Sequence, residues 1–230
     1  MKNTKSILID GFEHVPYTKN TLETKELIAQ STAFYKMLDE RRSVRDFSDK
    51  KIPKIVIENI INAASTAPSG AHKQPWTFCA VSNPLLKTKI RKAAETEEKE
   101  SYSSRMSEEW KADLKPIGTT WEKPFLEIAP WLIIVFKKAY DLSESGEKSK
   151  NYYVNESIGI ACGMLITAIH DAGLVTLTHT PSPMNFLEKI LERPKNERAF
   201  LLLPVGYPAD EVYVPKLDRK SLDEISVFFE

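Results

Sequence analysis

Trp131-Leu132-Ile133-Ile134-Val135-Phe136 is a nearly continuous apolar run of strand length. Such a run is typical of a strand that is buried on both faces, because neither face then presents polar side chains to water. We therefore expect a central strand with helices packed on both of its sides. Three shorter runs, at residues 76–81, 174–178 and 199–203, predict the other strands of a sheet of about four, because they are rich in aromatic, β-branched or leucine side chains.

Helical patterns separate these strands, and the whole is an α+β layout in which a central sheet is flanked by long helices. The glycines at 159 and 163 give the longest helical pattern a smooth face for close packing. Residues 1–20 show no periodicity and are expected to form an N-terminal arm that is ordered only by packing on something else. Residues 143–150 are expected to form a polar loop. Helices are predicted at residues 21–40, from Pro53 to Pro68, from Pro84 to Ala94, from Val154 to Gly173 and from Met184 to Leu191.

The composition limits the classes of function. The 230 residues suit one domain, against a prior of roughly 100 to 200 residues per domain. Lys plus Arg equals Asp plus Glu at 32 each, so no net charge favours nucleic acid or an anionic membrane as a partner. The two cysteines lie in apolar runs and indicate buried free thiols in a reducing compartment. No segment has the apolar length of a signal peptide or membrane helix, so we expect a soluble, cytoplasmic protein.

Two short polar motifs predict a binding cleft. Arg41-Arg42-Ser43-Val44-Arg45 places three guanidiniums within five residues, and planar guanidinium groups can hold phosphate oxygens bidentately. Ala67-Pro68-Ser69-Gly70-Ala71-His72 ends a helical run, which frees backbone N–H groups and a hydroxyl to face a ligand. There is no dinucleotide fingerprint, phosphate-binding loop or Cys/His cluster at ligand spacing, so the sequence predicts no metal site.

These two motifs, followed by Pro75-Trp76, Ala172-Gly173-Leu174-Val175-Thr176 and Leu203-Pro204-Val205-Gly206-Tyr207-Pro208, occur in the order seen in the nitroreductase superfamily of flavoproteins. The resemblance covers nearly the whole chain, from about Phe34 to the C-terminus. Because Glu98, Tyr102 and Lys123 also occur at the family spacing, the chain resembles more narrowly the iodotyrosine deiodinase family.

The resemblance implies a mostly antiparallel sheet in an obligate homodimer, with FMN at the subunit interface and terminal arms, residues 1–20 and 208–230, packed on the partner. Arg45 is expected at the pyrimidine edge of the flavin, where a fixed cation stabilises negative charge on the reduced ring. Thr180 is expected to be catalytic, because a hydroxyl donor at the flavin N5 favours one-electron steps. The resemblance assigns further cofactor contacts to Arg41, Arg42, Ser43, Val44, Ser69, Thr178, His179 and Arg219, with the arginines and Ser43 on the phosphate.

Glu98, Tyr102 and Lys123 are the candidate substrate residues. Glu98 and Tyr102 are four residues apart, on one face of a helix, whereas Lys123 can approach them only if the charged segment between them folds back. A carboxylate for an ammonium, with an ammonium and a phenol for a carboxylate, forms a receptor for an amino-acid zwitterion. The resemblance implies that residues 95–123, the lid, are mobile when empty and close over a halotyrosine whose phenolate is held by the backbone N–H of Ala71 and by the flavin.

The sequence therefore predicts FMN-dependent reductive dehalogenation of halotyrosines: 3-iodotyrosine, 3,5-diiodotyrosine and the bromo and chloro analogues. The alternative in the same superfamily is a general nitroreductase or quinone reductase that uses NAD(P)H and needs no zwitterion receptor. A flavin-binding protein without turnover and a flavin-free interaction module are the two readings from other classes. Some family members rely on a separate reductase, which makes such a protein a candidate partner.

Overall fold

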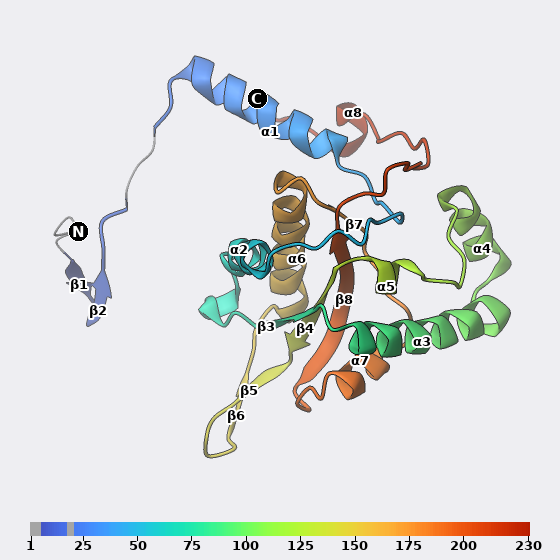
Figure 1. The fold of residues 1–230 in the computed structure, drawn as a ribbon. Coiled ribbons are helices and arrows are strands. Elements are labelled where there is room, and N and C mark those ends of the chain that lie inside the picture. The colour runs from blue at the N-terminus through green and yellow to red at the C-terminus, as the bar shows by residue number, and fades with distance from the viewer. Residues whose placement is uncertain (1–5, 18–20) are drawn as a thin grey trace. The chain divides into compact units, whose positions relative to one another are not determined.

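The computed structural model describes residues 6–17 and 21–230, and the chain divides into two compact units after Glu40 (Figure 1). In the first unit, β1 (Ile7–Ile9) pairs antiparallel with β2 (Phe12–His14), and α1 spans Thr24–Glu40 as predicted. Asp10 and Gly11 both have positive φ, 51° and 83°, as a two-residue hairpin turn requires. The N-terminal arm was predicted without regular structure. It contains this hairpin because Asp-Gly supplies the turn; residues 1–5 and 18–20 lie outside the described part of the chain.

The second unit is built on a four-stranded antiparallel sheet of order β3-β4-β8-β7, which confirms the predicted sheet. Leu132 to Phe136, the heart of the apolar run, are completely buried. In the register, Ile134 of β4 lies between Cys79 of β3 and Leu202 of β8. The strands are β3 (Trp76–Val81), β4 (Trp131–Lys138), β7 (Val175–Thr176) and β8 (Glu197–Gly206).

Helices cover both faces of this sheet (Figure 1). Because side chains alternate along a strand, Ile133 and Val135 of β4 pack in one core cluster, and Leu132, Ile134 and Phe136 pack in the other. The first cluster joins the sheet to α2 (Lys54–Ser65) and α6 (Val154–Asp171). The second joins it to α3 (Pro84–Glu100), α5 (Phe125–Ile128) and α7 (Asn185–Ile190).

The predicted strand at residues 174–178 is interrupted, and β7 is only two residues long. The pairing resumes at His179, whose N–H and C=O both bond to Leu202, at 2.9 and 3.1 Å. Between these points β8 carries Pro204, which has no N–H to donate, so the ladder breaks there. The Thr176 hydroxyl donates to the Pro204 carbonyl instead, at 2.7 Å. Thr178 lies in this break, exposed at the edge of the sheet.

Regular structure also occurs in the predicted polar loop and in the lid, for which a helical face at Glu98 and Tyr102 and mobility in the empty state were expected. The polar loop at 143–150 is the turn and second strand of a hairpin, β5 (Tyr140–Leu142) with β6 (Lys148–Lys150), because the turn at Ser143 to Gly146 lets the flanking residues pair. The lid continues α3 to Glu100. It then forms a π-helical turn, η2 (Ser101–Arg105), followed by α4 (Glu108–Leu114) and η3 (Lys115–Ile117). The remaining elements are η1 (Gly70–His72) and α8 (Leu222–Ile225).

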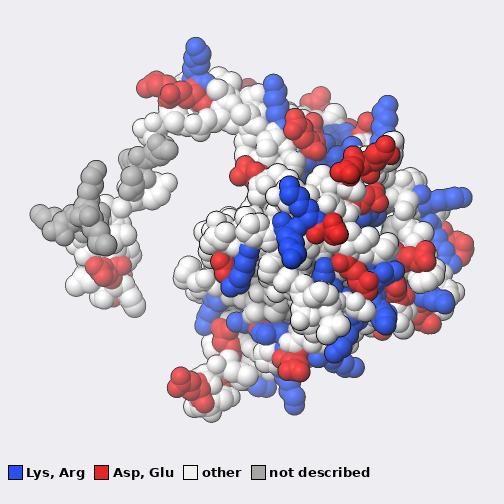
Figure 2. Space-filling view, in the orientation of Figure 1, with Lys and Arg blue, Asp and Glu red and all other residues white. Residues whose placement is uncertain are grey.

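On the visible face of the second unit, positive and negative side chains are mixed without a dominant sign, as the blue and red in Figure 2 show. Within residues 6–17 and 21–230, no helix has the length and apolar character needed to cross a membrane. Among the same residues, no three His, Cys, Asp or Glu side chains are grouped so as to hold a metal ion.

Candidate functional site

A cavity of about 170 Å³ lies between the lid and the end of the sheet. The lid contributes Glu98 and Tyr102 from the end of α3 and the π-helical turn, and Lys123 from the residues just before α5. The charged segment between Tyr102 and Lys123 therefore folds back, as it must if Lys123 is to approach Glu98 and Tyr102. Arg45 and the segment Thr178 to Thr180 form the opposite wall. Seven of the predicted site residues thus meet in one cavity.

The three predicted substrate residues are in mutual reach. Lys123 Nζ lies 3.6 Å from Glu98 Oε2 and 5.9 Å from the centre of the Tyr102 ring. The Lys123 side chain is nearly inaccessible, and its ammonium donates to Thr119 Oγ1 at 3.2 Å and to the Thr120 carbonyl. The Tyr102 hydroxyl donates to the Thr119 carbonyl at 3.2 Å. We call Glu98, Tyr102 and Lys123 the clamp.

Burial dominates the electrostatics of the clamp. It raises the pKa of Glu98 against the opposing effect of the Lys123 ammonium, and it lowers the pKa of Lys123 against the attraction of Glu98. Burial and the Glu98 charge raise the pKa of Tyr102, which keeps the phenol protonated and able to donate. Each charged group of the clamp is therefore incompletely compensated. A ligand that brings both an ammonium and a carboxylate would stabilise both charged forms.

His179 closes the wall behind Glu98. Its ring is 5% exposed, meets the Phe125 ring edge to face at 5.8 Å between centres, and places Nδ1 3.9 Å from Glu98 Oε1. Nε2 is buried and has no hydrogen-bond partner among the described residues. Burial, with the nearby Lys123 and Arg45 cations, lowers the pKa of His179 to about 3, so the imidazole is neutral. The structure thus places the ring of this predicted cofactor residue on the clamp side of the cavity.

Arg45 connects the clamp cavity to a second cavity of about 390 Å³, which is also lined by Ser43, by residues 116–118 of the lid and by residues 213–215. Its Nε is buried without a hydrogen-bond partner in the described part of the chain, and burial lowers the pKa of this guanidinium. The Val44 N–H donates to the Thr176 carbonyl at 3.2 Å, which ties the arginine motif to β7. A cation with an unused donor between two cavities is suited to a polar ligand edge.

The other predicted arginines gather at the same end of the unit. Arg219 donates to the Arg41 carbonyl at 3.1 Å, and Arg42 donates to the Pro215 carbonyl, so the arginine motif and the C-terminal segment hold each other. The pKa of Arg41 is lowered by burial and by repulsion from Arg219 and Arg42. Because the guanidiniums repel one another, an anion such as a phosphate would relieve them.

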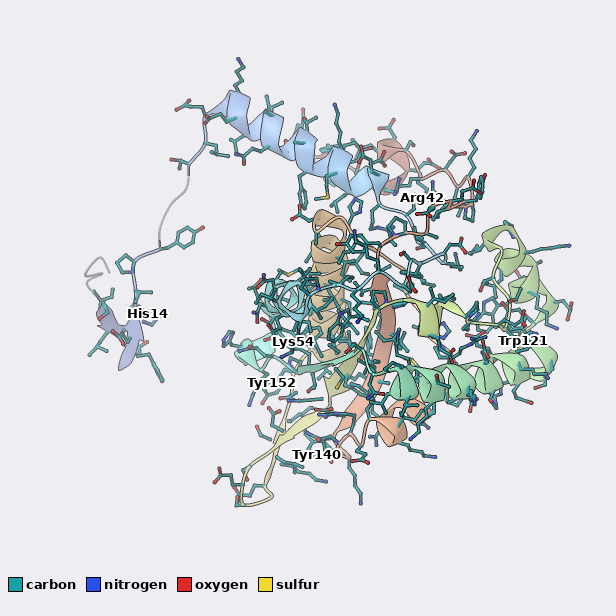
Figure 3. The ribbon with its side chains drawn as sticks, in the orientation of Figure 1. His14, Arg42, Lys54, Trp121, Tyr140 and Tyr152 are labelled. Atoms are coloured by element: carbon teal, nitrogen blue, oxygen red, sulfur yellow. The ribbon has the colours of Figure 1, made fainter. Side chains whose placement is uncertain are left out.

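Ser69 and Ala71 lie elsewhere. Ser69 Oγ accepts from the Gln74 N–H at 2.9 Å, and neither residue lines the two cavities described above. Their turn packs against Tyr152 and Tyr153, since a Cβ added at Gly70 would lie 2.9 Å from the Tyr153 ring. Tyr152 and the lid residue Trp121 lie on opposite sides of the second unit (Figure 3). One protomer therefore does not bring Ser69 and Ala71 to the clamp.

Sequence reasoning missed the apolar inner surface of the lid. Met106, Trp110 and Leu114 line the clamp cavity. Trp110 and Leu114 are four residues apart in a highly charged segment, and this helical spacing was the signal that could have identified them. It also missed how the lid is fastened: Ser101 Oγ and Arg105 Nη1 both donate to the Ser182 carbonyl, at 3.3 and 2.9 Å.

Comparisons with known proteins agree on one relationship. The model of the Nitroreductase family matches residues 38–207. The iodotyrosine deiodinase of Haliscomenobacter hydrossis is 61% identical over 215 residues, which cover 94% of this chain and 97% of that protein. Iodotyrosine deiodinase 1 of Homo sapiens is 46% identical over 219 residues, which cover 95% of this chain and 76% of the human protein.

Solved structures agree with these relatives. The crystal structure of an oxidized iodotyrosine deiodinase bound to FMN and 3-iodo-L-tyrosine matches with a TM-score of 0.72 and 32% identity, covering 86% of this chain and 98% of that one. A nitroreductase with bound FMN from Bacteroides fragilis has a TM-score of 0.63 at 19% identity, covering 85% of this chain and 98% of that one. At that identity the second match shows a shared fold.

Proposed function

The chain belongs to the nitroreductase family and, within it, to the iodotyrosine deiodinases, and from this premise we propose that it uses FMN to remove iodine reductively from iodotyrosine. The observation that carries the proposal is the clamp beside Arg45: a buried carboxylate and ammonium 3.6 Å apart, with a phenol, open into one cavity. A zwitterionic amino acid has the complementary charges.

The residues present fit FMN. Arg41, Arg42 and Arg219, with Ser43, would hold the phosphate, because the three guanidiniums lie close enough to repel one another and an anion would offset that repulsion. Arg45 would meet the ring edge with its unused Nε–H donor. Thr180, which lines the clamp cavity, would offer its hydroxyl to the flavin as the catalytic donor. When bound in its two-electron-reduced form, FMN would supply the two electrons of the reaction and be left oxidised.

The clamp would fix the orientation of the substrate in the cavity. Glu98 would accept from the substrate ammonium, whereas Lys123 and Tyr102 would donate to its carboxylate. With the amino-acid end fixed, the halogenated ring is left for the flavin side of the cavity. The reaction balances when the aryl halide takes two electrons and one proton and yields tyrosine and halide. Because the clamp would contact the ammonium and carboxylate of the substrate and not its halogen, we propose that diiodo-, bromo- and chlorotyrosine are also substrates.

We further propose that the active form is a homodimer in which Ser69 and Ala71 come from the second copy. Three observations support this assembly. These two residues lie away from the clamp of their own chain, and the exposed side of α6 carries Gly159 and Gly163, where an added Cβ would meet nothing within 4 Å. The proposed terminal arms also expose large apolar side chains: Ile7, Leu8, Ile9 and Phe12 in the first unit, and Leu222, Ile225, Val227, Phe228 and Phe229 in the second.

The test is an anaerobic single turnover. Purified protein is reduced with dithionite, 3-iodotyrosine is added, and flavin absorbance is followed together with tyrosine formation; tyrosine replaces iodotyrosine in the control. We expect flavin reoxidation to match tyrosine release. Reoxidation by nitroaromatics or quinones but not by iodotyrosine would instead identify the general reductase. Repeating the turnover with NADH, with NADPH, or with either plus a separate reductase identifies the electron donor.

A further inference from the structure

Glu95 lies one helical turn before Glu98 on α3 and outside both cavities. Its carboxylate contacts the clamp lysine through the main chain: Glu95 Oε1 accepts from the Lys123 N–H at 2.7 Å. This short bond joins α3 to the C-terminal end of the lid, where the chain returns from the lid helices to the sheet. A carboxylate that accepts from a backbone N–H makes a charge-assisted bond, which is stronger than one between neutral groups.

Arg91 holds this carboxylate in place. Its Nε donates to the same oxygen of Glu95 at 2.8 Å, and its Nη1 lies 3.4 Å from Glu127 Oε2 on α5. The Glu95 side chain is 17% exposed, so the contact is largely shielded from water. The guanidinium thus connects α3, which precedes Lys123 in the sequence, to α5, which follows it. Glu95 is fixed both by its own helix and by the helix that follows the lid.

The two carboxylates of α3 therefore act on different ends of Lys123. Glu98 faces the ammonium at 3.6 Å, and Glu95 fixes the backbone from which that side chain extends. The ammonium also depends on this backbone for its other bonds, to Thr119 and Thr120. If the Lys123 main chain moves, Nζ is displaced from all these partners together.

We propose that Glu95 is a positioning residue for substrate recognition, because it sets the main-chain position from which Lys123 reaches the substrate carboxylate. This inference rests on the proposed function. Glu95 acts through Lys123 without touching substrate or flavin, so its loss weakens the capture of the amino acid and leaves the chemistry of the bound substrate in place.

Glu95→Gln is the test, in the flavin-loaded protein with dithionite as the electron donor. The amide still fills the space and still presents one oxygen to the Lys123 N–H and Arg91 Nε, but it carries no charge, so both hydrogen bonds are weakened. We expect KM for 3-iodotyrosine to rise about tenfold, kcat to stay within about twofold, and flavin content and melting temperature to match wild type. Glu58→Gln, which removes a carboxylate from an exposed pair with Lys54, is the matched control and should change nothing.

A wild-type KM in Glu95→Gln would overturn the inference, as would a parallel loss of kcat and flavin affinity, which would show a general structural role. Arg91→Gln is the second variant in case Glu95→Gln does not fold; it keeps the Glu95 bond to Lys123 but frees the carboxylate, and about a threefold rise in KM is expected. An unchanged KM in that variant would also count against the role. Failure of the wild-type protein to turn over iodotyrosine would contradict the proposed function instead.

Discussion

The Glu98 carboxylate and the Lys123 ammonium face each other at 3.6 Å inside a cavity, and neither is fully compensated by the other. Burial raises the pKa of the acid and lowers that of the amine, which is the reverse of what an exposed ion pair would do. A buried pair of this kind adds little to stability by itself, because the cost of removing both groups from water offsets their attraction. Beside Arg45, the pair is suited to the proposed binding role, in which each group would meet an opposite charge on the ligand.

The first prediction concerns Glu98. Glu98→Gln removes the partner of the substrate ammonium while keeping the shape of the side chain. We expect KM for 3-iodotyrosine to rise roughly 100-fold, since a hydrogen bond to a charged group contributes about 1.5 to 3 kcal/mol. Steady-state kinetics with dithionite measures the effect, and flavin content should remain that of wild type. A variant with near-normal KM would show that the clamp does not read the ammonium.

The second prediction concerns acid stability. Because the pKa of His179 is about 3 in the folded protein and the ordinary value is 6.5, the unfolded chain binds the proton more readily between these values. The stability associated with the neutral ring is complete above about pH 6.5 and is lost as the pH falls toward 3. At pH 4 the loss of stability from this one group amounts to roughly 3 kcal/mol, at 1.36 kcal/mol per pKa unit.

His179→Asn should therefore flatten the acid limb of a plot of unfolding free energy against pH, as measured by urea denaturation between pH 4 and 8. His14→Asn, in the exposed hairpin, is the control and should leave the slope unchanged. Equal slopes for wild type and His179→Asn would mean that the imidazole is not buried in its neutral form.

The third prediction concerns Arg45. Arg45→Met keeps much of the side-chain length but removes the cation that would lie beside the flavin. The reduction potential of the bound flavin should fall by about 30 mV, which for two electrons corresponds to about 1.4 kcal/mol. Anaerobic dye titration measures the potential. Lys92→Met, on the exposed side of α3, should leave it unchanged, and an unaltered potential in Arg45→Met would place the guanidinium away from the cofactor.

Much of this fold could be predicted from the sequence because its strongest signals are local. The apolar run of β4 indicates burial on both faces whatever its neighbours are, and the long periodic pattern of α6 indicates a helix. The break in β7 also has a local cause, in Pro204 of the facing strand, but it becomes visible only once the register is known. The β5–β6 hairpin was missed because polar residues with little β propensity pair there through the geometry of their turn.

The site was harder to predict because its partners come from distant parts of the chain. Glu98 and Tyr102 share a helical face, and spacing indicates that much, but the meeting of Lys123 with both depends on how the lid returns to the sheet. The Glu95 contact to the Lys123 backbone has no sequence pattern, since any residue could supply that N–H. Helical spacing likewise could not show that Ser69 and Ala71 would lie away from the clamp.

The last prediction concerns the assembly. Within one chain, a Cβ added at Gly163 meets nothing within 4 Å and the position is exposed, so we expect Gly163→Leu to be tolerated by a monomer and to raise helix propensity by about 1 kcal/mol. If the protein acts as a monomer, the variant would therefore keep its mass, flavin and activity, and its melting temperature would rise slightly. If two copies pack through this side of α6, the leucine side chains collide at the smooth face and separate the copies.

We expect light scattering coupled to gel filtration to show a dimer for wild type and a monomer for Gly163→Leu. The variant should also lose bound flavin, because Ser69 of the second copy would no longer reach the cofactor, and Ala71 would no longer reach the substrate. Thr96→Leu, which also places a leucine at an exposed helical position, on α3, controls for added apolar surface and should stay dimeric. If Gly163→Leu remained dimeric and yellow, the copies would have to meet through another face, and Ser69 would lose its place in the site.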